Sequence, residues 1–215
     1  MSDHQNAGRF LSIDGVDGAG KSTQVERIAA HLESAGHDVI CVRDPGSTEL
    51  GSKLRALLLD SDLDMHRRTE AMLFMASRSE MIEQRIRPAL AAGQIVISDR
   101  FLLSTVVYQS VGAPNQRQCG VPAEQLWQLG RLACDGLQPQ LTVLLDMPAE
   151  RSLQRLHGDA DRMESRGLDY MRAVRDAYLQ QLPLASPHTH VVDAGAEIDD
   201  VTRRLIAVID QWLQQ

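Results

Sequence analysis

Glycines, a lysine and a serine follow the first apolar segment of the chain with the spacing Gly15-x-x-x-x-Gly20-Lys21-Ser22. Glycine lets backbone N–H groups approach an anion, lysine adds a point charge, and a serine hydroxyl is a ligand that Mg²⁺ accepts. Because a predicted strand precedes this spacing and a predicted helix follows it, we expect a loop that binds the phosphates of a nucleoside triphosphate rather than an ordinary glycine-rich turn. The residues expected at the triphosphate are Gly15, Val16, Asp17, Gly18, Ala19, Gly20, Lys21, Ser22 and Thr23.

Two carboxylates accompany this loop: Asp14 ends the predicted strand, and Asp17 lies inside the loop. A carboxylate repels bound phosphates unless a cation lies between them. We therefore expect Asp17 to accept a hydrogen bond from a substrate group or to hold a water on Mg²⁺. The alternatives are a solvated turn residue for Asp17 and a plain strand end for Asp14.

A later helical pattern carries an aromatic ring and a guanidinium on one face. Phe74 and Arg78 are four residues apart, so their side chains are neighbours on a helix surface. The ring could stack on a flat base, and the guanidinium could donate hydrogen bonds to the edge of that base. The alternative for Phe74 is an ordinary place in the hydrophobic core.

Polar residues also follow two other apolar segments. The stretch "VRDPGST" (42–48) follows one, and Asp99 and Arg100 follow another. The carboxyl ends of parallel strands share an edge with the phosphate loop, so we expect Asp99 and Arg100 to act in the site rather than form a structural ion pair. The next helix carries two polar pairs, Ser104 with Tyr108 and Thr105 with Gln109.

The elements that must position these groups alternate along the chain. The predicted strands cover residues 9–14, 38–42, 95–98, 141–146 and 190–193. The helix after the first strand is indicated by Val25, Ile28, Ala29 and Leu32 and ends at Gly36, and the last helix is indicated by Val201, Leu205, Val208, Ile209 and Trp212. Strands this apolar require cover on both faces, which predicts an α/β fold with a doubly wound, five-stranded parallel sheet between helices.

Composition excludes several classes of protein. The 215 residues are expected to form one domain, and the net charge of −7 argues against a general binder of nucleic acid or membrane surfaces. Cys41, Cys119 and Cys134 form no C-x-x-C pair and leave one cysteine over, which favours a reduced, cytoplasmic location. No apolar stretch is long enough for a membrane span, and the first residues do not resemble a secretion signal.

The motifs, in this order, resemble those of thymidylate kinases, which belong to the P-loop kinases. The matching stretches are "GVDGAGKST" (15–23), "RDPGST" (43–48), "KLRALLLD" (53–60), "TEAMLFMASR" (69–78), "DRFLLSTVVYQ" (99–109) and "DRME" (161–164). The resemblance implies Mg²⁺-assisted, in-line transfer of phosphate from ATP to dTMP, giving dTDP for dTTP supply, by a homodimer. Two alternatives stay open: another nucleotide or nucleoside kinase of this fold, or a regulator that binds nucleotides without turnover.

The resemblance also implies roles at the base and the sugar. Phe74 would stack on thymine, and Arg78 would bond its carbonyl edge. Thr105 and Gln109 would complete the base pocket, with Ser104 beside it. Tyr108 would lie against the sugar, where a ribose 2′-hydroxyl would otherwise go.

Further roles by resemblance concern phosphate and metal. Arg100 would bind the monophosphate with help from Arg43 or Arg55, above a loop shaped by Pro45. Ser22, Asp17 and Asp99 would hold Mg²⁺ between them, directly or through water, and the two aspartates would also meet the sugar 3′-hydroxyl. Lys21, Asp17 and Arg100 are then the expected catalytic residues of the loop side.

A short lid is expected at about residues 155–166. One branch of the family has an arginine at the position of Gly18, and the other branch supplies it from a lid, so this chain should use its lid. The candidates are Arg155, Arg162 and Arg166, of which Arg162 is the first choice and Arg155 the second. The alternative is a solvated polar loop that donates no catalytic arginine.

Overall fold

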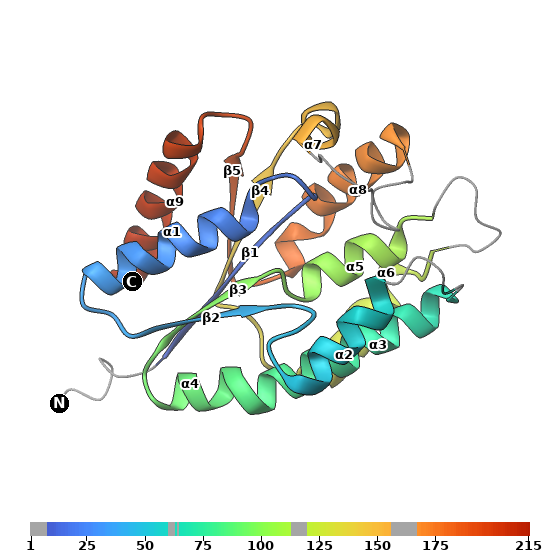
Figure 1. The fold of residues 1–215 in the computed structure, drawn as a ribbon, viewed down its shortest axis with the longest axis horizontal. Coiled ribbons are helices and arrows are strands. Elements are labelled where there is room, and N and C mark those ends of the chain that lie inside the picture. The colour runs from blue at the N-terminus through green and yellow to red at the C-terminus, as the bar shows by residue number, and fades with distance from the viewer. Residues whose placement is uncertain (1–7, 60–62, 64, 113–119, 156–166) are drawn as a thin grey trace.

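The computed structural model describes residues 8–59, 63, 65–112, 120–155 and 167–215. One sheet of five parallel strands runs through these residues in the order β2-β3-β1-β4-β5 (Figure 1). The strands are β1 (Arg9–Gly15), β2 (Val39–Arg43), β3 (Ile95–Asp99), β4 (Leu141–Asp146) and β5 (His188–Asp193). The predicted α/β class and the five parallel strands are confirmed, and β5 begins two residues earlier than predicted, at His188.

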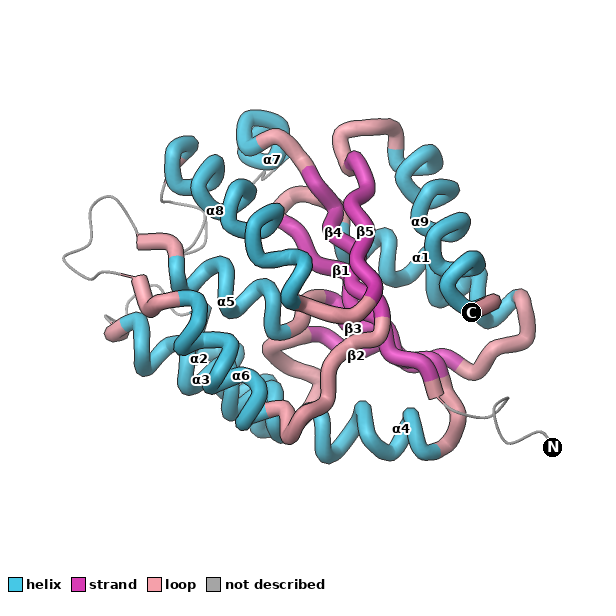
Figure 2. The backbone as a smooth tube through the Cα atoms, turned by 180° about the vertical axis from the view of Figure 1, so that it is seen from behind, coloured by secondary structure: helices cyan, strands magenta, loops and turns pink. Residues whose placement is uncertain are grey.

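Helices cover both faces of this sheet. Helices α1 (Lys21–Ser34) and α9 (Ile198–Leu213) lie on one face, whereas α5 (Leu102–Ser110) and α8 (Leu168–Gln181) lie on the other (Figure 2). The remaining helical elements are α2 (Glu49–Leu59), α3 (Arg67–Met81), the π-helix η1 (Ile82–Ile86), α4 (Arg87–Ala91), α6 (Ala123–Ala133), α7 (Ala149–Arg155) and the 3₁₀ turn η3 (Leu182–Leu184). No helix among the described residues is long and apolar enough to cross a membrane.

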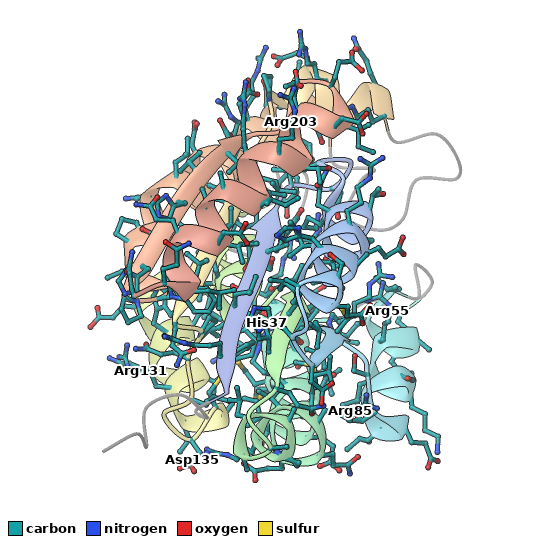
Figure 3. All side chains as sticks on the ribbon, turned by 90° about the vertical axis from the view of Figure 1, so that its left-hand side faces the viewer. His37, Arg55, Arg85, Arg131, Asp135 and Arg203 are labelled. Carbon is teal, nitrogen blue, oxygen red and sulfur yellow. The ribbon has the colours of Figure 1, made fainter. Side chains whose placement is uncertain are left out.

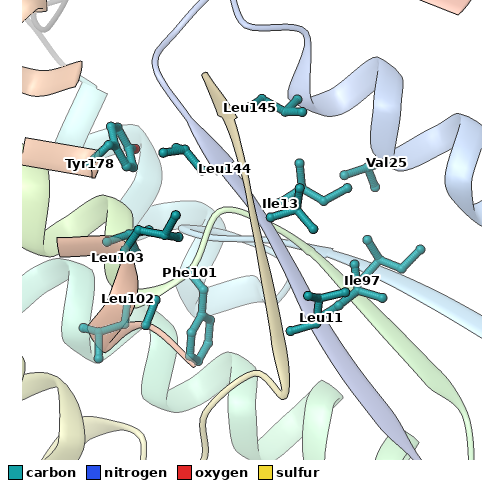
Figure 4. Close-up of a cluster of buried hydrophobic side chains, with 14 of the residues drawn as sticks. Leu11, Ile13, Val25, Ile97, Phe101, Leu102, Leu103, Leu144, Leu145 and Tyr178 are labelled. Carbon is teal, nitrogen blue, oxygen red and sulfur yellow. The ribbon is translucent and has the colours of Figure 1, made fainter. Parts of the chain in front are cut away.

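The central strands are buried because helices flank them. Figure 4 shows Ile13 of β1 with Val25 of α1 on one side of the sheet, and Leu144 of β4 with Leu103 and Tyr178 on the other. All five side chains are at most 5% exposed. Strands buried on both faces need continuous apolar runs, which explains why these segments show no polar alternation.

The two predicted helix faces pack as expected. Val25, Ile28, Ala29 and Leu32 of α1 are buried, and Gly36, with a φ of 89°, lies just beyond the helix end. In α9, Val201, Leu205, Ile209 and Trp212 are buried, and Val208 is half-buried against the core. Outside the core, Arg85, Arg131 and Arg203 are exposed on separate elements, η1, α6 and α9 (Figure 3).

The register of the parallel strands gathers polar residues at one edge. Asp99 of β3 is opposite Ile13 of β1 on one side and Arg43 of β2 on the other, and Gly15 is opposite Leu145 of β4. The loops that follow these strands therefore leave the sheet side by side, which is where an open α/β sheet binds its ligands.

Candidate active site

The loop between β1 and α1 has a backbone that only glycine adopts readily. Gly15, Gly18 and Gly20 have φ values of 151°, 76° and 89°. A Cβ on Gly15 would lie 2.6 Å from the carbonyl oxygen of Leu145, so the loop also passes too close to β4 for any side chain there. Lys21 then starts α1, whose free N–H groups face the loop. This is the geometry of an anion-binding loop at a helix N-terminus.

Lys21 is folded back across the loop. Its Nζ donates to the carbonyl oxygen of Val16 at 2.8 Å and lies 3.8 Å from Oδ1 of Asp17. Burial and the nearby Arg100 guanidinium lower the pKa of Lys21 to about 8. A phosphate beside Nζ would favour the protonated form and raise this pKa.

Asp17 accepts hydrogen bonds from two side chains outside the loop, Arg100 after β3 and Tyr108 of α5. Nη2 of Arg100 donates to its Oδ1, and the Tyr108 hydroxyl donates to Oδ2 at 2.7 Å. Burial favours the neutral acid, but Arg100, Lys21 and the Tyr108 hydrogen bond outweigh it and lower the pKa of Asp17 to about 2. Asp17 is therefore an anion at physiological pH, and its negative charge meets a cation that the chain itself supplies.

Arg100 adopts an uncommon backbone conformation at the end of β3, with a φ of 70°. The two hydrogens of its Nη1 are shared among three acceptors: the carbonyl oxygen of Gly15 at 3.0 Å, Oγ of Ser104 at 3.1 Å and the Tyr178 hydroxyl at 2.9 Å. Burial lowers the pKa of Arg100 but Asp17 raises it, and the net result is a pKa well above the usual value. The guanidinium is thus a fixed positive charge between the phosphate loop and α5.

Ser22 and Asp99 offer oxygen atoms to a hard cation. The Ser22 hydroxyl donates to Oδ2 of Asp99 at 2.7 Å, and Oδ1 of Asp99 is buried with no hydrogen-bond partner among the described residues. An uncompensated buried carboxylate oxygen beside a hydroxyl fits Mg²⁺, which prefers oxygen ligands. The described residues contain no cluster of three or more His, Cys, Asp or Glu for a metal.

A cavity of about 200 Å³ lies beside Arg100, and we call it the α5 cavity. Its lining residues are Asp17, Arg43, Asp44, Pro45, Arg55, Leu59, Phe74, Arg100, Ser104, Thr105, Tyr108 and Gln109. The structure thus gathers the predicted acceptor residues around one space, except Arg78 and Asp99, which do not line it. Asp44 and Leu59 line it without having been predicted.

Phe74 belongs to this cavity and not to the core. Its ring is half-buried and lines the open space, whereas Met75, the next residue of α3, is 3% exposed in the core. Gln109 contributes an amide of which both Oε1 and Nε2 are buried without a hydrogen-bond partner among the described residues. A buried amide that lacks partners is costly and is available to pair with a ligand.

Arg78 lies beneath the α5 cavity, 1% exposed. Its Nε donates to Oδ2 of Asp44 at 2.6 Å, and its Nη2 donates to Oγ1 of Thr105 at 2.6 Å. Burial raises the pKa of Asp44, although Arg78 opposes that shift. Arg78 therefore reaches the cavity through two lining residues, and its predicted contact with a base edge stays a prediction.

Three contacts to the loop side of the site were not predicted. Asp14 is fully buried, and its Oδ1 accepts from the Ser104 hydroxyl at 2.6 Å. Tyr178 of α8 contacts Arg100, and the hydroxyl of Ser152 in α7 donates to the Asp17 carbonyl oxygen at 2.5 Å. Asp14 and Ser104 are polar residues inside otherwise apolar segments, which is a signal in the sequence, whereas Ser152 and Tyr178 lie in polar helices and carry no such signal.

A second cavity, of about 250 Å³, lies on the other side of the phosphate loop, and we call it the β5 cavity. Its lining residues are Ala19, Gly20, Gln24, Arg155, Ala194, Gly195, Ala196, Glu197, Ile198 and Val201. Nη1 of Arg155 donates to the carbonyl oxygen of Ala194 at 3.3 Å, so this lid candidate lies at the β5 cavity. Arg162 and Arg166, with the rest of the predicted lid, lie outside the described residues.

Comparisons with known proteins agree on one family. Residues 13–205 match the family model described as thymidylate kinase. The chain is 62% identical over 205 residues to a thymidylate kinase of Rhodopirellula baltica, covering 95% of this chain and 81% of that protein. It is 41% identical over 213 residues to one from Bifidobacterium longum subsp. infantis (97% and 88%) and 40% over 210 residues to one from Ectopseudomonas mendocina (96% and 97%). With the phosphate loop and the α5 cavity in place, the chain belongs to the thymidylate kinase family.

Proposed function

We infer that this protein transfers the γ-phosphate of ATP to dTMP and releases ADP and dTDP. Family membership supports the reaction, and one structural observation carries the assignment of the sites. The Asp17–Arg100 pair joins the phosphate loop to a cavity lined by an aromatic ring, a tyrosine and an amide that has no hydrogen-bond partner in the described part of the chain. If the triphosphate of ATP binds at the loop and the base of dTMP binds in the cavity, the phosphate of dTMP would lie next to Arg100.

We propose that the loop and Lys21 hold the triphosphate of ATP. The N–H groups at the start of α1 and the Lys21 ammonium supply positive charge where phosphate oxygens would lie. When bound, Mg²⁺ would neutralise charge on the phosphates, and Ser22 and Asp99 are the residues that would hold it. The β5 cavity, which adjoins Gly20, would receive the nucleoside of ATP.

We propose that the α5 cavity receives dTMP. Phe74 would stack on thymine, and Gln109 would pair with the polar edge of the base, since its amide is buried and without partners among the described residues. Tyr108 would lie at the sugar, and its hydroxyl donates a hydrogen bond to Asp17. Arg100 would bind the monophosphate with help from Arg43 or Arg55, which line the same cavity.

Phosphoryl transfer requires the protein mainly to position the two substrates and to supply positive charge. An oxygen of the acceptor monophosphate is already an anion at neutral pH, so no side chain has to remove a proton. Lys21 and Arg100 both approach Oδ1 of Asp17 and would stabilise charge that spreads over the transferred group. Arg162 stays proposed, by resemblance alone, as the lid arginine, and Ala variants of Arg155, Arg162 and Arg166 would test that role by their kcat.

A coupled assay of ADP release tests the proposal. ATP is offered with dTMP, dUMP, dCMP or thymidine, and with no acceptor. We expect the highest kcat/KM with dTMP. A preference for dCMP or thymidine would identify another kinase of this fold, and tight ATP binding without acceptor-dependent ADP release would identify a regulator.

We further propose that the protein is a homodimer that pairs through α3 and α6. A groove of about 450 Å³ lies between these helices, lined by His66, Arg68, Thr69, Ala71, Met72, Val121, Gln125, Leu126 and Leu129. Met72 at its edge is 53% exposed, and apolar surface of this kind is typical of a contact between proteins. Sedimentation should give a dimer, and Met72→Glu should shift the protein toward the monomer.

We also propose a cytoplasmic location. Of the three cysteines, Cys41 and Cys134 are free thiols, one exposed and one buried, which is expected for a protein kept in a reducing compartment. Fractionation of cells that express the chain would test this.

A further inference from the structure

A chain of hydrogen bonds leads away from Arg100 into the interior. Nη1 of Arg100 donates to the Tyr178 hydroxyl at 2.9 Å, and that hydroxyl lies 2.7 Å from Oγ of Ser104. Ser104 in turn donates to Oδ1 of Asp14 at 2.6 Å. The chain joins three elements that are distant in sequence: β1, which carries Asp14, α5, which carries Ser104, and α8, which carries Tyr178.

The direction of each bond follows from the number of hydrogens. A hydroxyl has one hydrogen to donate. Because Ser104 gives its hydrogen to the Asp14 carboxylate, Tyr178 must donate to Ser104. Tyr178 therefore accepts from Arg100 and donates to Ser104, and the buried Asp14 carboxylate ends the chain.

The surroundings of Tyr178 keep this arrangement in place. Its side chain is 1% exposed, and its ring packs edge-on against Tyr108 with 6.0 Å between centroids and 85° between planes. Burial raises the pKa of the Tyr178 hydroxyl, although Arg100 opposes that shift, so the hydroxyl keeps its hydrogen. The ring thus touches one partner of Asp17 while the hydroxyl touches the other.

We propose that Tyr178 is a positioning residue for phosphoryl transfer: with Asp14 acting through Ser104, it fixes the Arg100 guanidinium in the orientation that meets the acceptor phosphate. An arginine side chain has many rotamers, and the Nη1 side of this one is bound to oxygens of Gly15, Ser104 and Tyr178. Holding that side in place leaves the Nη2 side for Asp17 and the α5 cavity. The inference rests on the acceptor role proposed for Arg100.

Tyr178→Phe removes the hydroxyl and keeps the ring. Because hydrogen bonds to charged groups are stronger than neutral ones, we expect the Kd for dTMP to rise about tenfold. The Kd for a non-hydrolysable ATP analogue should change by less than about twofold, since Tyr178 does not line the β5 cavity. Calorimetric titration measures both.

Ser12→Ala is the matched control. Ser12 is also buried, and its hydroxyl donates to Oγ1 of Thr142 at 3.1 Å, away from Arg100. Neither Kd should change in this variant. Asp14→Asn keeps the shape of the side chain and removes its charge, so it should weaken dTMP binding in the same direction by about threefold. This second variant tests the proposal even where Tyr178→Phe folds poorly.

A double variant with Tyr178→Phe and Arg100→Lys distinguishes a positioning role of Tyr178 from a merely structural one. If Tyr178 acts through Arg100, its substitution should have little further effect once the guanidinium is gone. Additive losses, or equal losses of dTMP and ATP-analogue binding, would mean a merely structural role and would overturn the inference. So would unchanged dTMP binding in Tyr178→Phe beside weakened binding in Arg100→Lys. Unchanged dTMP binding in Arg100→Lys would instead overturn the acceptor role of Arg100.

Discussion

The two cavities on either side of the phosphate loop are built from different parts of the chain. Side chains make the α5 cavity: a ring, an amide, a phenol and several charged groups, many of them already hydrogen bonded to one another. Five of the ten described residues that line the β5 cavity are glycine or alanine. Gln24, which also lines it, uses both atoms of its amide in bonds to Ile198 and Thr202.

The two linings lead us to expect that the protein selects its two nucleotides with different strictness. A site that pairs buried polar groups with a ligand rejects analogues strongly, because a wrong ligand leaves those groups unpaired. The amide of Gln109, which has no hydrogen-bond partner among the described residues, is such a group in the α5 cavity. The glycines and alanines of the β5 cavity offer a ligand no polar side-chain group. We therefore expect the acceptor to be selected far more strictly than the donor.

The largest effect is expected at Lys21, which lies where the phosphate loop ends and α1 begins. Lys21→Ala should lower kcat at least about 10²- to 10³-fold, because it removes a charge that the transferred phosphate needs. Lys53→Ala is the matched control, since Lys53 is exposed on α2 and paired only with Glu49 in the described structure. Near-normal ADP release by a folded Lys21→Ala protein would contradict the assignment of the phosphate loop.

Phe74→Ala should affect one cavity alone. Loss of stacking should weaken dTMP binding by about 1–3 kcal/mol and leave binding of an ATP analogue unchanged. Calorimetric titrations with each ligand measure the two effects. If Phe74 were a core residue instead, its substitution would lower the free energy of unfolding by about 3–5 kcal/mol with no selective loss of dTMP binding.

The pKa of Lys21 gives the donor side a pH dependence. Its pKa of about 8 in the free protein means that the protonated form falls from nearly all at pH 7 to about a tenth at pH 9. Because phosphate binds the protonated form, the affinity for an ATP analogue should fall about tenfold between these pH values. Lys21→Arg keeps its charge throughout and should show no such fall. Equal affinity at pH 7 and pH 9 in the parent protein would contradict the lowered pKa.

Local patterns in the sequence were enough to predict most of the fold and the phosphate loop. Buried strands such as β1 and β4 show as uninterrupted apolar runs, and the loop depends on glycines close together in the chain. The gathering of Phe74, Thr105 and Gln109 around one cavity followed only from the family resemblance. Periodicity could not separate Phe74 from Met75, because both lie in one helix and only packing decides which of them meets the core.

The supporting contacts could not be predicted, for a physical reason. Asp14 and Ser104 are 90 residues apart in sequence, and Tyr178 lies 78 residues beyond Arg100. Their pairing depends on how α5 and α8 pack on the same face of the sheet, which no local pattern records. From the sequence alone, Asp14 is therefore indistinguishable from a plain strand end, and its bond to Ser104 is visible only in the structure.

The smallest effect is expected where the β5 cavity receives the base of the donor. Ala194, Gly195 and Ala196 line that space, and Arg155 donates a hydrogen bond to the carbonyl oxygen of Ala194. Replacing ATP with GTP should therefore lower kcat/KM by less than about tenfold. Replacing dTMP with dCMP should lower it by about 10²-fold or more, because the amide of Gln109 would lose a matched partner. Donor discrimination equal to or greater than acceptor discrimination in the ADP-release assay would contradict the contrast between the two cavities.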